Sequence, residues 1–235
     1  MNLSPAMRHK MKHQKVEVKA ENQELSLEPK SLHLLLIELE NDMAVLKSIN
    51  RIEDKITHKR DVLIPKYRSS IDDYLANKET YDNPLFSQMI IWLFDIEELD
   101  TAIEWCDKAI ELGVTSPFNR DLATFCASHV LEWAHKMSNT GHSIEPYFSQ
   151  TFKKVQDKWR LNEKLTCQYF KFAGLFLLRD NDGQPRASSV GDIETLEKAY
   201  ALLSEADNIY GKAKVKTVLD NISQRIRAIK DGVNL

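Results

Sequence analysis

The chain has 235 residues, a formal net charge of -3, and 43% apolar and 29% charged residues. This balance excludes a disordered chain, and the length allows one large domain or two small ones. No apolar segment approaches the roughly 20 residues that span a bilayer, and the basic start of the chain is followed by polar sequence, so we expect neither a membrane protein nor a secreted one. Three cysteines without a C-x-x-C pair indicate reduced, buried thiols and an intracellular protein.

Residues 1–28 are basic and are expected to form a flexible arm. The first 19 residues contain five lysine or arginine residues against one acid, Glu17. Such a segment can bind the phosphates of DNA and become ordered on binding, although an ordinary charged tail has the same composition. The arm residues that we expect to contact DNA are Arg8, His9, Lys10, Lys12 and Lys15.

Residues 29–80 are expected to form an oligomerising and DNA-binding region built on a long helix or a helical hairpin. From about residue 30 to about residue 60, apolar residues recur every three or four positions, which predicts one amphipathic helix roughly 45 Å long. A helix of that length favours a coiled-coil or hairpin role. Pro65 should bend the chain, because the residue before a proline is pushed out of the helical region. A second amphipathic helix should follow over about 67–75.

A cationic ridge is predicted on the long helix. Four basic residues follow one another at four-residue steps, so on a continuous helix they lie along one slowly winding line with Arg60 beside it. The residues at these steps are Lys47, Arg51, Lys55 and Lys59. Such a ridge can neutralise phosphates along a duplex without reading its sequence. Glu53, Asp54 and Asp61 lie nearby, so a solvated helix face explains the pattern equally well.

Residues 81–235 are expected to form a helical body, which makes the whole protein all-α. Prolines and glycines separate segments of helical periodicity, and no segment alternates as a strand does. The expected helices cover about 85–112 (two helices that meet at Asp95), 119–138, 146–160, 162–179, 192–209 and 212–230. Two Ala-Ile pairs stand seven residues apart, at 102–103 and 109–110, a spacing that lets a neighbouring helix approach closely. We therefore predict a helical-repeat-like, tetratricopeptide-like bundle.

The sequence contains no recognisable catalytic site. The P-loop pattern G-x-x-x-x-G-K-[ST] is absent, so a nucleotide-driven step belongs to a partner. Acids that could serve a metal-dependent nuclease occur at 72–73, 95–100 and 180–182, but caps, turns or solvated faces explain each of them. Cys126, His129, His135 and His142 have poor spacing for zinc. We therefore assign no catalytic residue, no metal ligand and no intrinsic cofactor.

Several short blocks resemble the small terminase subunits, also called packaging endonuclease subunits, of temperate contractile-tailed phages. The opening S-P-A-M-R-H-K-M at residues 4–11 is similar to the start of that family. Further blocks are L-K-S-I at 46–49, K-R at 59–60, W-L-F-D at 92–95, A-I-E-L-G at 109–113 and G-L-F-L at 174–177. The blocks follow the family's order and extend over most of the chain.

The resemblance implies recognition of the cohesive-end site in double-stranded viral DNA, assembly into a homo-oligomer, and partnership with a large terminase ATPase subunit. It also implies an endonuclease role, a requirement of the holoenzyme for Mg2+, and a location in the cytoplasm of the bacterial host. Because the residues supply no nuclease site, we interpret cleavage as a property of the holoenzyme. Two alternatives stay open: an intrinsic nuclease that uses the scattered acids, and a helical interaction scaffold without affinity for DNA.

Overall fold

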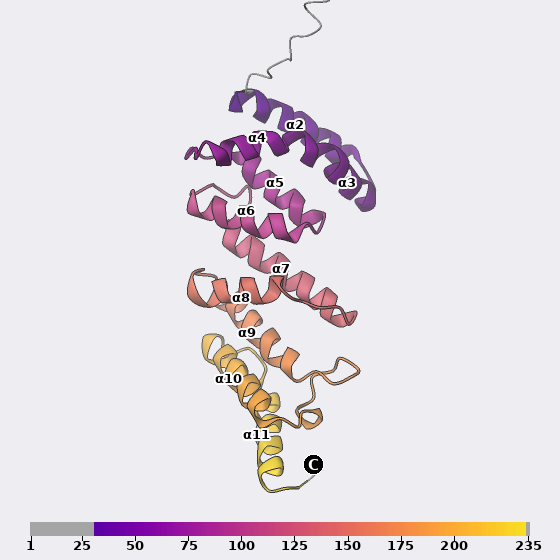
Figure 1. The fold of residues 1–235 in the computed structure, drawn as a ribbon, viewed down its shortest axis with the longest axis vertical. Coiled ribbons are helices and arrows are strands. Elements are labelled where there is room, and N and C mark those ends of the chain that lie inside the picture. The colour runs from indigo at the N-terminus through magenta and orange to yellow at the C-terminus, as the bar shows by residue number, and fades with distance from the viewer. Residues whose placement is uncertain (1–30, 234–235) are drawn as a thin grey trace, which may run out of the picture.

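The computed structural model describes residues 31–233, and these residues fold as helices joined by short connections (Figure 1). In this range the elements are α2 (Leu32–Ser48), α3 (Ile52–His58), the π-helical turn η1 (Lys59–Leu63), α4 (Ile64–Ala76), α5 (Pro84–Asp95), α6 (Leu99–Glu111), α7 (Leu122–Asn139), α8 (Tyr147–Asp157), α9 (Glu163–Leu177), the 3-10 turn η2 (Ala187–Ser189), α10 (Ile193–Ile209) and α11 (Lys216–Lys230). Across 31–233 an isolated bridge between Arg179 and Pro185 is the only strand-like pairing. The all-α prediction is confirmed.

The helices follow one another along the long axis of the molecule nearly in chain order (Figure 1). Because α5 to α9 run back and forth across this stack, the connections 77–83, 112–121 and 158–162 lie at one edge, and 96–98 and 140–146 lie at the other. A hydrogen bond from Thr115 to Asp82 joins two connections of the first edge, and Lys136 reaches Glu97 at the second. The tetratricopeptide-like interpretation of this stack stays a prediction. Among the helices of residues 31–233, none is long and apolar enough to cross a bilayer.

The segment from residue 31 to residue 60 belongs to a helical hairpin, and the expectation of one continuous helix is wrong. Helix α2 ends at Ser48, and both Ile49 and Arg51 have extended backbones before α3 begins. The chain then reverses, so that α4 returns along α2 and its Lys66 and Tyr67 donate hydrogen bonds to Asp42. A straight helix would carry the chain away from the body, whereas the reversal brings α4 back to the core, where its Ile64, Tyr67 and Ile71 are buried.

The bend expected at Pro65 is absent, because the helix continues through it. Ile64, the residue before the proline, keeps helical angles of φ -62° and ψ -49°. The π-helical turn η1 comes directly before this position. Proline lacks an N–H group and its ring crowds the carbonyl group one turn earlier, and a π turn widens the helix where this crowding occurs.

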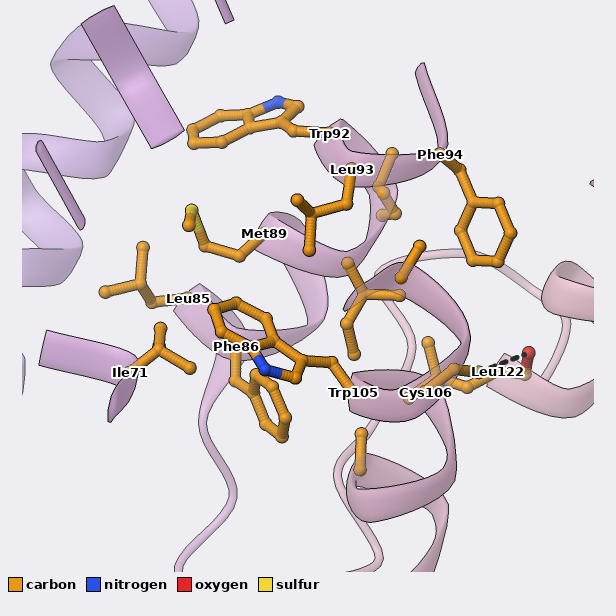
Figure 2. Close-up of a cluster of buried hydrophobic side chains, with 14 of the residues drawn as sticks. Ile71, Leu85, Phe86, Met89, Trp92, Leu93, Phe94, Trp105, Cys106 and Leu122 are labelled. Atoms are coloured by element: carbon orange, nitrogen blue, oxygen red, sulfur yellow. Dashed lines mark hydrogen bonds between the residues drawn. The ribbon is translucent and has the colours of Figure 1, made fainter. Parts of the chain in front are cut away.

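Helix α5 forms the centre of the core that joins the hairpin to the body (Figure 2). Its side chains Phe86, Met89 and Leu93 are completely buried, and the same cluster contains residues of α2, α4, α6 and α7. All three cysteines are buried and free, as predicted, and Cys106 donates a hydrogen bond to the carbonyl oxygen of Leu122. The hairpin and the first part of the body therefore share one hydrophobic core.

Polar residues begin most helices of the body. The side chains of Asn83, Asp121, Asn162 and Asp192 each accept a hydrogen bond from a backbone N–H group in the first turn of the following helix. Such caps satisfy donors that have no partner inside the helix, and each stabilises the helix by roughly 1 kcal/mol. These caps explain why the predicted starts of α5, α7, α9 and α10 agree closely with the structure.

Candidate nucleic-acid interface

The turn of the α2–α3 hairpin carries most of the predicted DNA-binding residues that the structure describes. Lys47 lies in the last turn of α2, Arg51 lies in the turn of the hairpin, Lys55 lies in α3 and Arg60 lies in η1. Lys47, Arg51 and Arg60 are exposed, and none of these four forms an ion pair with another residue of 31–233. Because the chain breaks between Lys47 and Arg51, these residues follow the chain through the hairpin turn into η1 and do not form one straight ridge. Their contact with DNA stays a prediction.

Lys59 differs from its neighbours because it faces the protein. Its Nζ atom lies 2.6 Å from Oδ2 of Asp95, at the end of α5, and only 14% of its side chain is exposed. The sequence pattern could not reveal this pairing, because Asp95 lies on another helix. Lys59 therefore joins the hairpin to the body, and it has little surface to offer a duplex.

The N-terminal part of the predicted interface lies outside the described residues. This part consists of Arg8, His9, Lys10, Lys12 and Lys15. At the hairpin turn itself, the cations share the surface with Glu53, Asp54 and Asp61, which are all exposed. With Lys59 paired to the body, the positive excess at the turn is small.

A second surface of the hairpin is apolar and exposed. Leu34, Ile37 and Val45 of α2 are each about half exposed, and Ile52 of α3 is 74% exposed. The opposite face of α2 buries three leucines in the core, so this helix is apolar on both sides. A helix with two apolar faces is typical of one that packs between two partners, and an exposed apolar patch is typical of an interaction site.

Comparison with known proteins identifies the family. The family model described as phage small terminase subunit matches residues 36–164. A protein named "Probable terminase, endonuclease subunit", from Haemophilus phage HP1 (strain HP1c1), is 35% identical over 198 residues, which cover 83% of this chain and 70% of that relative. This chain belongs to the phage small terminase subunit family. Membership supports a role of this terminase subunit in phage DNA packaging, and no solved structure shows a significant match.

Several of the acids of this terminase subunit that could serve a nuclease are engaged in the fold, whereas Asp73 and Asp182 are exposed and form no ion pair within residues 31–233. Glu97 pairs with Lys136, Glu98 pairs with Arg68, and Asp95 pairs with Lys59. The carboxylate of Asp180 accepts hydrogen bonds from two backbone N–H groups of its own loop and pairs with an arginine. Within residues 31–233, no three His, Cys, Asp or Glu side chains gather as metal ligands. These residues do not fit a Mg2+ site, and we derive no metal-dependent step on this chain.

The cysteine and histidines considered for zinc have separate surroundings. Cys126 is fully buried, and burial, together with hydrogen bonding to Cys106, raises the pKa of its thiol. Nδ1 of His129 lies 3.0 Å from the carbonyl oxygen of Phe125, and His142 bonds to Thr140. His135 lies against the ring of Phe172, and burial lowers its pKa. The four residues have structural contacts in the terminase subunit and do not converge.

Proposed function

We propose that this terminase small subunit binds double-stranded viral DNA at the cohesive-end site, self-associates, and recruits the large ATPase subunit for cleavage and packaging in the bacterial cytoplasm. One observation carries this proposal beyond family membership: the α2–α3 hairpin presents exposed cations and an exposed apolar face on the same element. The cations suit a polyanion, and the apolar face suits a protein partner.

The DNA contact uses the hairpin turn together with the N-terminal arm. Backbone phosphates are neutralised at the hairpin by Lys47, Arg51, Lys55 and Arg60. The counterions that are released make binding strongly dependent on salt concentration. The arm adds the basic residues from Arg8 to Lys15, a segment that contains no acid. Contacts of this kind position a protein on a duplex but do not read its sequence.

Self-association uses the exposed face of α2. Leu34, Ile37 and Val45 lie on the side of α2 that is turned away from the body, so a second copy of the hairpin can cover them. Covering this face removes apolar surface from water, which stabilises the association by about 25 cal/mol for each Å2 buried. A closed oligomer would also bring several cationic turns to one DNA molecule and raise the overall affinity by multivalency.

We assign ATP hydrolysis and DNA cleavage to the holoenzyme. The sequence has no P-loop, so the energy for translocation comes from the large subunit. The carboxylates of Asp95, Glu97 and Glu98 are held in ion pairs, which favours site recognition and assembly as the work of this subunit.

Light scattering of the purified protein, with and without duplex DNA from the cohesive-end region, tests DNA binding and self-association together. Replacing Lys47, Arg51, Lys55 and Arg60 by glutamate should strongly weaken DNA binding and leave helical circular dichroism intact. Unchanged binding would reject the role of the hairpin turn, and the arm should then be truncated. Replacing Leu34, Ile37 and Val45 by serine should reduce the particle mass, and an unchanged mass would reject the α2 face as the self-association surface.

A further inference from the structure

An open hollow of about 670 Å3 lies between the α6–α7 connection and the α8–α9 connection. Three cations line it: Arg120 comes from the first connection, and Lys158 and Arg160 come from the second. These connections are far apart in the sequence, and the antiparallel course of α7 and α8 brings them to the same edge of the helical stack (Figure 1).

The three cations are exposed, and none of them forms an ion pair with any residue between 31 and 233. The guanidinium group of Arg120 lies 5.0 Å from the ring centroid of Phe125 and 5.7 Å from that of Phe118. Aromatic faces therefore hold the arginine in position while its N–H groups stay open to an acceptor. Other lysines of the body have acidic partners: Lys108 pairs with Glu104, Lys136 with Glu97, and Lys154 with Asp107.

The acids at the rim of the hollow are used to build its wall. Asp121 accepts a hydrogen bond of 2.6 Å from the backbone N–H group of Thr124 and so caps α7. Asp82 accepts hydrogen bonds from the hydroxyl and the backbone N–H group of Thr115, and these bonds lower its pKa. Asp121 is the only acid that lines the hollow within residues 31–233, so the cations are in excess there.

We propose that this hollow binds the phosphodiester backbone of duplex DNA and forms a second DNA contact of the subunit. The proposal rests on the proposed function, and it adds a site separate from the hairpin turn. Arginine and lysine bind phosphate oxygens, and Phe118, which is 46% exposed, offers an apolar surface to the adjacent sugar. The pairing of Lys59 with Asp95 places the hairpin turn toward the opposite edge of the stack, so the two sites engage separate stretches of backbone.

Duplex binding of the full-length protein at several salt concentrations tests this proposal. The hollow variant replaces Arg120, Lys158 and Arg160 by glutamine. Its matched control replaces Lys198, Lys212 and Lys216, near α10 and α11, by glutamine, so both variants lose the same formal charge. In fluorescence anisotropy, the hollow variant should bind a random-sequence duplex at least about 10-fold more weakly than the wild type, with the slope of log K against log salt smaller by about 2–3. The slope of log K against log salt for the control variant should stay within about 1 of the wild-type slope.

Hydrogen exchange of the wild-type protein gives a second readout that does not depend on a variant. Duplex DNA should protect residues 113–123 and 158–162 from exchange, and inorganic phosphate at the same ionic strength should not. Protection by inorganic phosphate alone would overturn the proposal in favour of a small-anion site. If the wild type binds DNA but the hollow variant matches its control, this proposal fails and the proposed function stands. If the wild type binds no duplex at low salt, both fail.

Discussion

The ion pair between Lys59 and Asp95 predicts that Lys59 stabilises the fold and contributes little to DNA binding. Their charged atoms lie 2.6 Å apart, and the two side chains are 14% and 34% exposed. An exposed ion pair contributes about 0–1 kcal/mol, whereas removing one partner of a fully buried pair costs about 3–5 kcal/mol. Partial burial places the cost of Lys59→Met between these limits, at about 1–3 kcal/mol.

Urea and thermal denaturation measure this cost directly. In a chain of this size, about 1 kcal/mol corresponds to roughly 2–4 °C, so Lys59→Met should lower Tm by about 2–12 °C. The control is Lys55→Met, because Lys55 lies one turn earlier and has no ion pair in the described part of the chain, and its change should stay within about 0.5 kcal/mol. Asp95→Asn should destabilise by a similar amount to Lys59→Met, and the double variant should cost less than the sum of the two.

DNA binding by the same variants decides between the two roles of Lys59. Below its lowered Tm, Lys59→Met should bind duplex DNA as the wild type does, whereas Lys55→Met should bind more weakly because it loses a phosphate contact. A Lys59→Met protein of unchanged stability and reduced DNA affinity would refute the structural role and restore Lys59 to the interface.

Three further predictions concern the stability of the fold. Burial opposes ionisation of Asp42, but hydrogen bonds from a lysine and a tyrosine of α4 outweigh it and lower its pKa. The stability that this group contributes is therefore present above its unfolded pKa of about 3.9 and is lost as the pH falls through its lower pKa in the folded protein. Asp42→Asn should therefore lower the free energy of unfolding at pH 7 and have less effect in strong acid. Gly174→Val should lower stability by about 1–3 kcal/mol, because an added Cβ lies 2.7 Å from Cγ of Leu203, whereas Gly191→Val has open space and should cost less in thermal melts. Tyr169→Phe removes a buried hydrogen bond of 2.7 Å to the backbone of α7 and should cost about 1–3 kcal/mol in urea denaturation, and an unchanged midpoint would contradict that role.

Much of the secondary structure could be predicted from local sequence. Asn83 followed by Pro84 marks the start of α5, and Asn162 marks the start of α9, because cap and first-turn preferences act over a few residues. Within α2 the apolar stripe correctly marked Leu35, Leu39 and Leu46 as buried, whereas its Ile52, in α3, is 74% exposed. It could not show that the chain reverses at 49–51, because an apolar stripe continues with the same spacing through a short break.

The candidate site was less predictable, because its charges depend on partners from other helices. Lys55 and Lys59 occupy equivalent steps in the sequence, yet Lys59 finds Asp95 and Lys55 finds no partner among the described residues. Arg120 and Arg160 carry no shared sequence signal, although the basic residues on both sides of Trp159 could have drawn attention to that segment.

The sequence by itself determined that this terminase subunit is helical and where most of its helices begin, because caps, breakers and periodicity are local features. It also determined the family, because the short blocks that resemble the family can be recognised one by one along the chain. Only the tertiary structure decided which lysines and arginines form ion pairs with acids and which of them line the same hollow. Ion pairs such as Lys59 with Asp95, and hollows such as the one lined by Arg120, Lys158 and Arg160, form between segments whose distance in space is set by helix packing.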